Sequence, residues 1–512
     1  MKSSSSTLGA GQRRPGPLAL SLPLVAVNIG LLFVFDLAHH LALTLALLGA
    51  AFLGLLVMAR RLEAAGVSAG GAILLGALLL RLPLLPLPPT LSDDVLRYLW
   101  DGKVAAAGLN PYALAPAAER LTPLRDETWR RLPHTQVPTV YPPLSIAAFS
   151  ISSRLPFPML SWKVIVIAAD LLGCWLLLEL ARRLGAPEGR TVWYAWNPLV
   201  ALEGAGMGHV DVLGVTAAVG AVLWLVSRRS LGGAAAWGAA GVLTKLVPLP
   251  AFPMWARQSG RPARFLAMAG GLVALAGLPV LAATGGIPPG LLIYGKSWEF
   301  NGPLFEPLWR LLDRIEAAPV LARGLDLVKG WTGLHEELDV LYPYLYPQFL
   351  AKLALAVGIA AAVALSLREK DPLDGTGRLF GRALLCSATF YPWYLLWVLP
   401  WAALRRDAAW LALSGLILLS YLPQRAGVEL WPWVYLGIWG PFFALLVLGR
   451  RGFWGGMPSE TSPSVPLPGG EGGPSDPGKA AASSSPLSRS GGGRWERGPG
   501  GEASKGVPPQ RA

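Results

Sequence analysis

Two adjacent carboxylates follow an apolar, proline-rich segment in the stretch LSDDVLRYLWDG. A carboxylate within reach of a hydroxyl group can take up its proton while the oxygen attacks a carbon atom, so Asp93 and Asp94 are candidates for a general base. The pair could also help to bind a divalent cation such as Mg²⁺ or Mn²⁺, although such ions need about six oxygen ligands, and no cofactor is certain. In the simpler interpretation, Ser92 caps a helix, and the helix dipole favours the two aspartates in its first turn.

The residues that continue this stretch predict a polar face on a helix. Asp94, Arg97, Tyr98 and Asp101 are spaced three or four residues apart, so a helix would place them on one side as a stripe of mixed charge. Arg97 could form a bidentate contact with an anion, or it could pair with an aspartate of its own helix. Both interpretations of Arg97 remain open at this point.

The helices that must position these residues are predicted to cross a membrane. Of the 512 residues, 53% are hydrophobic and only 15% are charged, and the apolar runs are too long for the core of a soluble protein. A hydrocarbon layer of about 30 Å needs about 20 apolar residues per helix. The clearest predicted spans are 17–35, 38–58, 70–88, 160–181, 191–206, 210–227, 264–284, 348–367, 408–422 and 432–449.

Two further apolar segments, 232–256 and 379–404, are interrupted by prolines. Proline removes a backbone donor and breaks the helical ladder, so each segment predicts either a kinked helix or a pair of short helices. The whole chain is then expected to contain about 11 to 14 membrane segments. The predicted fold is an all-α, polytopic transmembrane helical bundle.

The distribution of arginine predicts the orientation of these spans. Short cytoplasmic loops retain positive charge, which assigns one side of the predicted spans to the cytoplasm. The long loops 89–140 and 285–347 then face outward. This topology explains most of the formal net charge of +13, so no nucleic-acid partner is expected. The arginine pairs on the cytoplasmic side are 13–14, 60–61, 182–183, 228–229, 405–406 and 450–451.

Three regions follow from this pattern. Residues 1–69 are expected to form accessory transmembrane helices, and residues 70–450 are expected to form the core. Residues 451–512 are rich in Gly, Pro and Ser and cannot bury enough apolar surface to offset the entropy of ordering them, so they predict a disordered cytoplasmic tail. Cys174 and Cys386 lie inside predicted spans and indicate neither a disulfide framework nor a metal site.

Four ionisable residues stand in or beside apolar segments. Glu203, His209 and Asp211 lie where two predicted spans meet, and Lys245 lies in a proline-broken segment. Ionisable groups at membrane depth are costly and usually functional. Alternatively, Asp211 caps a turn, His209 makes a structural hydrogen bond, and Lys245 extends to the membrane boundary.

Several longer stretches carry a resemblance to a known family. They are SDDVLRYLWDGKVAAAGLNPY with the later YPPL, WNPLVALEGAGMGHVDVLG, LTKLVPLPAFP, YGKSWEFNGPLFEPL and ATFYPWYLLWVLPW. Together they resemble the multi-spanning sugar transferases of the glycosyltransferase C superfamily, and within it the bacterial mannosyltransferase-like enzymes that use polyprenyl-phosphate sugars. The resemblance covers about residues 75–405. Relatives commonly carry Gly-His-Asn-Asp where this chain has Val210 in place of the asparagine.

The resemblance implies transfer of a hexose from a polyprenyl-phosphate donor to a glycolipid or glycan acceptor. Mannose is the hexose that the resemblance favours. The resemblance also places the reaction at the outer face of the bacterial cytoplasmic membrane, among membrane lipids, with inversion at the anomeric carbon. One of Asp93 and Asp94 would be the base, and the other would position the acceptor or help to bind a cation. Cations would stabilise the departing phosphate, and the candidates are Arg97, Lys103 and Lys245.

Other side chains are predicted to line the substrate pocket. Trp298 offers an aromatic face to a sugar ring, although tryptophan also commonly anchors membrane boundaries. Tyr141 begins a Tyr-Pro-Pro turn that would close the first outward loop over the site or would merely start a helix. The predicted pocket residues are Asp101, Tyr141, Glu203, His209, Asp211, Trp298, Glu299 and Asn301.

Two other classes of protein fit parts of the sequence. A polytopic lipid or glycolipid transporter, including a flippase, would also contain broken helices and buried charges. Its polar residues would be expected midway along the spans, whereas the densest polar cluster here lies in the first outward loop. A non-catalytic membrane scaffold is a third possibility, against which the intact pair Asp93 and Asp94 argues.

Overall fold

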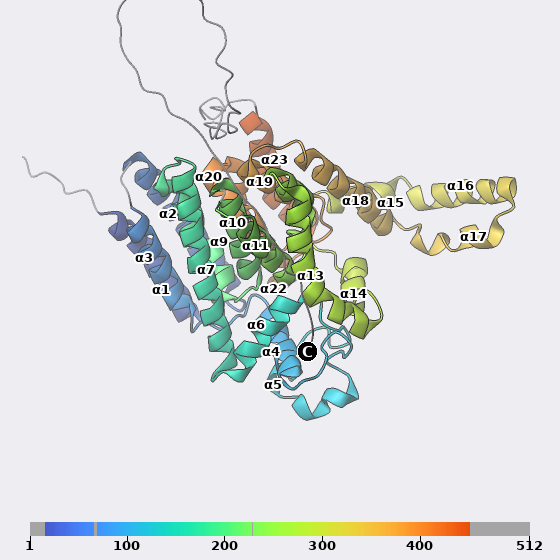
Figure 1. The fold of residues 1–512 in the computed structure, drawn as a ribbon, viewed down its shortest axis with the longest axis horizontal. Helices are drawn as coiled ribbons and strands as arrows, with labels where there is room; N and C mark the ends of the chain where they lie inside the picture. The colour runs from blue at the N-terminus through green and yellow to red at the C-terminus, as the bar shows by residue number, and fades with distance from the viewer. Residues whose placement is uncertain (1–15, 66–68, 228, 451–512) are drawn as a thin grey trace, which may run out of the picture. The chain divides into compact units, whose positions relative to one another are not determined.

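Long apolar helices dominate the structure, a computed structural model that describes residues 16–65, 69–227 and 229–450 (Figure 1). Within these ranges there is no β-sheet, only isolated bridges between the loops at Phe300 and Thr389. This confirms the prediction of an all-α, polytopic membrane bundle. Six segments are long and apolar enough to cross a membrane, and they coincide largely with α1 (Leu22–Val34), α2 (Leu41–Ala65), α7 (Pro158–Arg183), α13 (Pro262–Thr284), α18 (Pro347–Ser366) and α23 (Tyr435–Arg450).

Other predicted spans form shorter helices. Three of these are apolar but have fewer than 18 residues: α3 (Gly70–Arg81), α10 (Asp211–Ser227) and α11 (Leu231–Thr244). Segment 408–422 divides into α21 (Ala408–Leu416), a 3₁₀ turn and the start of α22 (Tyr421–Ala426). The total of about 11 to 14 membrane segments stays a prediction for these shorter elements.

Segment 191–206 does not form the single spanning helix that its composition predicts. It contains α8 (Val192–Ala195), α9 (Pro198–Ala201) and a π-helical turn over Leu202–Gly206. The break occurs because proline disfavours the helical conformation of the residue before it. Asn197 is accordingly extended, and its side chain accepts the backbone N–H of Leu199 at 3.0 Å as a new helix cap.

The two proline-broken segments form short helices, which is one of the two alternatives that the sequence leaves open. In the first, α11 ends at Thr244 and α12 (Phe252–Gln258) begins after a 3₁₀ turn. In the second, α19 (Pro372–Leu385) is followed by a 3₁₀ segment over Pro392–Trp397 and by α20 (Leu399–Arg405). Each break leaves polar or aromatic side chains at a helix end inside the bundle.

The first long loop contains helices and is packed onto the bundle. It contains α4 (Asp94–Ala106) and α5 (Glu127–Arg130), and α4 packs along α6 (Pro143–Arg154). Figure 1 shows these three helices gathered at one end of the bundle. The α4 and α6 backbones approach so closely at Gly102 that a Cβ atom there would lie 2.3 Å from the carbonyl oxygen of Phe149. This contact fixes the position of the helix that carries Asp94.

The second long loop is also largely helical. It contains α14 (Pro289–Ser297), α15 (Phe305–Arg314), α16 (Ala317–Thr332) and α17 (His335–Asp339). Figure 1 shows α16 and α17 extending away from the bundle. The α14 backbone meets the first loop at Gly290, where a Cβ atom would lie 2.3 Å from the carbonyl oxygen of Pro138. The two predicted outward loops are therefore in contact.

All described residues belong to one compact unit. In that unit α1 packs against α3, and α10 packs against both α7 and α11. The proposed division at residue 69 stays a prediction. The predicted tail, 451–512, lies outside the described residues.

A buried ion pair joins α3 to α7 in the interior of the bundle. The Arg81 guanidinium donates from Nε to Asp170 at 2.6 Å, and neither side chain is exposed. Arg81 Nη1 also donates to the carbonyl oxygens of Ala77 and Ala195, each at 2.8 Å. The pair therefore ties the bundle to the start of the broken segment that begins at α8.

We expect Asp170→Ala to destabilise the protein by about 3–5 kcal/mol, because the substitution leaves a buried guanidinium without its anion. Thermal unfolding in detergent measures the effect. Glu127→Ala is the matched control, since Glu127 pairs with Arg130 through side chains that are both more than 70% exposed, and exposed pairs contribute little. Equal melting temperatures for the Asp170 variant and the native protein would contradict this role of the pair.

Candidate functional site

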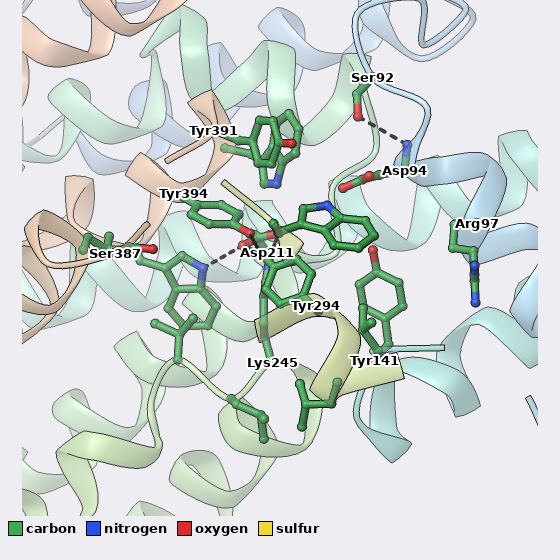
Figure 2. Close-up of a pocket in the computed structure, with 18 of the residues that line it drawn as sticks. Ser92, Asp94, Arg97, Tyr141, Asp211, Lys245, Tyr294, Ser387, Tyr391 and Tyr394 are labelled. Carbon is green, nitrogen blue, oxygen red and sulfur yellow. Dashed lines mark hydrogen bonds and ion pairs between the residues drawn. The ribbon is translucent and has the colours of Figure 1, made fainter. Parts of the chain in front are cut away.

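A cavity of about 490 Å³ opens beside the N-terminus of α4 (Figure 2). Its volume lies in the range of small-molecule sites. Residues from both long loops line it, together with residues from the two proline-broken segments and from α22. Its ionisable lining comprises Asp93, Asp94, Arg97, His134, Tyr141, Asp211, Lys245, Tyr294, Tyr391, Tyr394 and Arg425.

Asp94 is the first residue of α4 and lines this cavity. Asp93 is the N-cap position, one residue later than predicted, while the Ser92 hydroxyl still accepts the backbone N–H of Asp94 at 3.3 Å. The Asp94 side chain is 39% exposed, and that exposure opens into a cavity walled by protein. Burial there raises the pKa of Asp94 above its usual value of 3.8, and His209 and Lys245 offset this only in part.

Asp93 points to a different partner. Its Oδ2 lies 3.3 Å from Nη2 of Arg425, a cavity residue on α22. Arg425 also donates from Nε to the carbonyl oxygen of Leu91 at 3.0 Å, which ties α22 to the start of α4. Arg425 carries no local sequence signal for this contact, because 332 residues separate it from Asp93.

Of the two interpretations of Arg97, the structure shows pairing within its own helix. Its Nε donates to both carboxylate oxygens of Asp101, at 2.9 and 3.0 Å, and its Nη2 donates to the carbonyl oxygen of Val137 at 2.6 Å. Arg97 lines the cavity, but Asp101 is buried behind it and does not. Lys103 also lies away from the cavity lining, where its ammonium pairs with Asp126 at 2.7 Å.

Lys245 follows the last residue of α11 and contacts the start of α10. Its ammonium lies 2.7 Å from both carboxylate oxygens of Asp211, which is fully buried. The indole N–H of Trp397 donates to Asp211 at 2.7 Å, and the Tyr394 ring lies under the ammonium at 4.7 Å. The helix break at Lys245 thus places a paired cation on the cavity wall, across from Asp94 (Figure 2).

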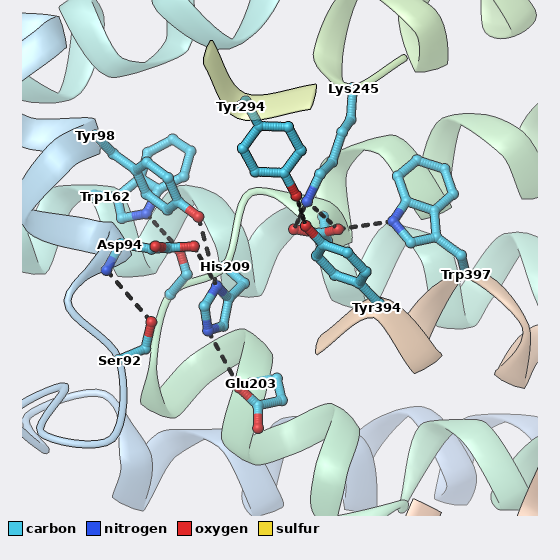
Figure 3. A network of polar contacts seen from close by, with 12 residues as sticks. Ser92, Asp94, Tyr98, Trp162, Glu203, His209, Lys245, Tyr294, Tyr394 and Trp397 are labelled. Carbon is cyan, nitrogen blue, oxygen red and sulfur yellow. Dashed lines mark hydrogen bonds and ion pairs between the residues drawn. The ribbon is translucent and has the colours of Figure 1, made fainter. Parts of the chain in front are cut away.

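Glu203 and His209 lie behind Asp94 rather than on the cavity surface. His209 Nδ1 is 3.8 Å from Asp94 Oδ2, and Nε2 is 3.2 Å from Glu203 Oε2 (Figure 3). Both side chains are fully buried, and neither belongs to the lining of the cavity. The structure therefore brings both residues close to the site, but neither can contact a ligand in the cavity.

The predicted residues of the two long loops divide into two groups. Trp298 lines the cavity beside His134, with ring centroids 4.7 Å apart, and Tyr141 lines it as well. Glu299 instead pairs with Lys352 at 2.7 Å. Asn301 is buried, where its side-chain oxygen accepts the indole N–H of Trp439 at 2.8 Å. The predictions that Glu299 and Asn301 face the pocket do not fit this lining.

Part of the cavity wall is apolar and was not anticipated in detail. The aromatic-proline stretch near residue 391 contributes Tyr391, Trp393 and Tyr394, and the Tyr394 hydroxyl bonds to that of Tyr294 on α14. Helices α14, α18 and α19 and the chain after α11 supply the aliphatic side. Its members are Leu246, Val247, Pro250, Leu291, Ile359, Ala383 and Leu384.

The side chains around Asp93 and Asp94 do not fit the ligand set of a divalent cation. Among the described residues, no three His, Cys, Asp or Glu side chains are grouped to hold a metal ion. Asp93 and Asp94 turn to different partners, a guanidinium at 3.3 Å and an imidazole at 3.8 Å. A hard cation would need further oxygen ligands around both carboxylates.

Comparisons with known proteins point to one kind of enzyme. Residues 4–258 match the family model described as "Alpha-(1->6)-mannopyranosyltransferase, N-terminal domain". A probable alpha-(1->6)-mannopyranosyltransferase of Mycolicibacterium smegmatis is 26% identical over 370 residues, 62% of each chain. GPI mannosyltransferase 1 of Gibberella zeae is 34% identical over 122 residues, 22% of this chain and 28% of the relative. This chain thus spans less than two thirds of either relative, and no solved structure matches.

We expect Lys245→Met to destabilise the protein by about 3 kcal/mol, because the substitution leaves the buried Asp211 carboxylate with only the Trp397 N–H. The double variant Lys245→Met, Asp211→Asn should recover most of the loss, since it removes the uncompensated charge. Thermal unfolding of the detergent-solubilised variants measures both effects. A single variant as stable as the native protein would show that the pair does not stabilise the bundle.

Proposed function

We propose that this chain, whose residues 4–258 match the family model of the alpha-(1->6)-mannopyranosyltransferase N-terminal domain, is a membrane hexosyltransferase of glycosyltransferase C type that moves mannose. The proposed donor is a polyprenyl-phosphate mannose, and the proposed acceptor is a hydroxyl group of a glycolipid or glycan. The observation that carries the proposal is the Asp94 carboxylate, which faces a cavity that has cations on its walls and an apolar side.

Asp94 is the better candidate for the general base. Among the described cavity-lining carboxylates, Asp93 pairs with Arg425 and Asp211 pairs with Lys245, whereas Asp94 has no lysine or arginine partner. A carboxylate held by a guanidinium is a weaker proton acceptor, because the ion pair stabilises its ionised form. The raised pKa of Asp94 brings its basicity closer to what proton transfer near neutral pH requires.

The proposed reaction is a single displacement. The acceptor oxygen attacks the anomeric carbon while Asp94 takes up the hydroxyl proton, and the bond from that carbon to the phosphate oxygen breaks with its electron pair leaving on the phosphate. Attack from the face opposite the leaving group inverts the anomeric centre. Carboxylates near the sugar would stabilise a transition state with oxocarbenium character.

The cations of the cavity wall suit the departing phosphate. Lys245, Arg425 and Arg97 all line the cavity, and each is already held by a carboxylate. These pairs fix the cations in place before the donor binds, so little reorganisation is needed when negative charge develops on the phosphate. Lys103 has no part in this proposal, because it lies outside the cavity lining.

The aliphatic side of the cavity suits the lipid part of the donor. Leu291, Ile359 and Leu384 come from α14, α18 and α19, of which α18 is apolar and long enough to cross a membrane. A polyprenyl chain that lies against such a surface keeps its apolar area, and that of the cavity wall, away from water. Trp298, His134 and Tyr141 form a more polar edge that suits a sugar ring.

We place the protein in the bacterial cytoplasmic membrane with the cavity facing outward and residues 451–512 in the cytoplasm. The six apolar helices support a multi-pass protein. The sidedness rests on the arginine pairs that flank the predicted spans, since positive charge is retained in short cytoplasmic loops.

We expect Asp94→Asn to lower kcat for mannose transfer by at least about 100-fold, because the amide cannot accept the acceptor proton. Asp93→Asn is the matched control and should retain much more activity, since Asp93 acts beside Arg425 rather than as the base. Transfer of radiolabelled mannose from a purified polyprenyl-phosphate donor in membranes from expressing cells measures both. Retained transfer by Asp94→Asn would refute the proposed function, and lipid movement without transfer would indicate a transporter.

The acid limb of the pH profile should lie above pH 3.8, the usual pKa of an aspartate. Asp94 must be ionised to act as a base, and burial raises its pKa, so kcat/KM should fall as the pH drops through this raised value. The measurement is kcat/KM against pH at saturating acceptor, with stability checked at each pH. An acid limb at or below the usual aspartate value would contradict the assignment of Asp94.

A further inference from the structure

Behind Asp94 stands a line of buried side chains that the displacement itself does not use. His209 lies between two carboxylates, 3.8 Å from Asp94 Oδ2 and 3.2 Å from Glu203 Oε2 (Figure 3). The other oxygen of Glu203 accepts a hydrogen bond from the Tyr421 hydroxyl at 2.6 Å. His209, Glu203 and Tyr421 are fully buried, and none of them lines the cavity.

We propose that His209, anchored by Glu203 and Tyr421, is the positioning residue of Asp94. It holds the Asp94 carboxylate in one orientation towards the cavity. The inference rests on the proposed function. It replaces the expectation that His209 and Glu203 contact the substrate.

Both ring nitrogens of His209 face polar groups. Nε2 lies 3.2 Å from Glu203 Oε2, and Nδ1 lies 3.8 Å from Asp94 Oδ2 and 3.5 Å from the Tyr98 hydroxyl. The ring therefore stands between the carboxylate of Asp94 and its anchor, Glu203.

The surroundings of His209 hold its ring in place. The Trp393 ring stacks on the imidazole, with centroids 3.9 Å apart and an interplanar angle of 15°. The backbone N–H of His209 donates to the carbonyl oxygen of Glu203 at 2.9 Å. This hydrogen bond follows directly after the π-helical turn. Gly208, at φ +76°, allows the chain to reverse there in a left-handed conformation that favours glycine. A fixed ring can orient the carboxylate that it faces.

The other charged groups near Asp94 are engaged elsewhere. Lys245 pairs with Asp211, and Arg97 pairs with Asp101. Lys163 of α7 lies near Gly208, but its ammonium donates to the carbonyl oxygens of Leu84 and Leu87. Within the described residues, His209 is thus the basic residue whose side chain lies nearest to the Asp94 carboxylate without a lysine or arginine between them, at 3.8 Å.

Two tyrosines pack beside the contact between His209 and Asp94. The Tyr98 hydroxyl lies 3.5 Å from His209 Nδ1, and Tyr141 packs edge-on against Tyr98. The remaining anions that face Asp94 are Asp93 and Asp211, which both oppose its ionisation. Without His209, Asp94 would lie near Asp93 and Asp211. The cationic partners of those two aspartates are already engaged with them.

The test is His209→Gln, which keeps a polar side chain of similar length and removes the imidazole ring. We expect kcat to fall about 10- to 100-fold, as for residues that orient a reactive group, while KM for the polyprenyl-phosphate mannose changes less than about twofold. The acid limb of kcat/KM should move to higher pH, because His209 is one of the groups that lower the pKa of Asp94. His335→Gln, an exposed histidine on α17, is the matched control and should behave as the native protein.

Two results would overturn the inference. A native kcat and acid limb in His209→Gln would show that the ring only packs, and a raised KM at native kcat would show that it contacts the substrate. If His209→Gln does not fold, Glu203→Gln decides: it keeps the shape and removes the charge of the anchor, and we expect a lower kcat at unchanged KM. A native kcat in Glu203→Gln would equally refute the proposal.

The outcome for Asp94 separates this inference from the proposed function. If Asp94→Asn retains mannose transfer, the proposed function itself fails. If Asp94→Asn is inactive while folded His209→Gln behaves as the native protein, only the positioning role of His209 is refuted.

Discussion

The structure depends on the need to pair every ionised group inside an apolar bundle. Removing a charge from water is costly, so buried charges persist only with partners. Arg81 meets Asp170 in the interior, and at the cavity Lys245 meets Asp211 and Arg425 meets Asp93. Asp94 departs from this pattern among the described cavity-lining carboxylates, since its partner is an imidazole at 3.8 Å. A carboxylate that is less firmly paired can also accept a proton more readily, so the constraint on burial favours Asp94 as the proposed base.

Contacts within the site can be predicted from the sequence only where the two residues lie close together along the chain. The Arg97 and Asp101 contact follows from the three- or four-residue spacing of a helix face, and it was one of two open interpretations. The sequence marks four of the site residues as functional candidates, but it does not show which side chains they contact. These four are Asp94, His209, Asp211 and Lys245. Their partners come from separate helices, and only the packing of the bundle decides which helices meet. Arg425 carries no local signal, so sequence reasoning could not find it.

The elements of the fold show the same limit. Apolar runs identified the long helices, because a membrane span requires a fixed length of apolar chain. The same criterion failed for residues 191–206, where Pro198 and the π-helical turn divide one apolar run into short pieces. These irregularities place Glu203 and His209 behind Asp94, next to the cavity. The break before Lys245 has the same effect. Composition shows that a segment is apolar, but not where a ligand site interrupts it.

The proposed chemistry suits a site of nearly balanced charge. Asp93, Asp94 and Asp211 face the cavity together with Arg97, Lys245 and Arg425. In the displacement, Asp94 loses one negative charge when it takes up the proton, and the phosphate gains one when it departs as a monoester. The total charge in the cavity is unchanged, and the negative charge moves from beside His209 towards the cations on the wall. In a low-dielectric site this transfer is favourable when those cations are already fixed, because no water has to reorganise around the new charge. The ion pairs that stabilise the bundle therefore also prepare the cavity for the leaving group.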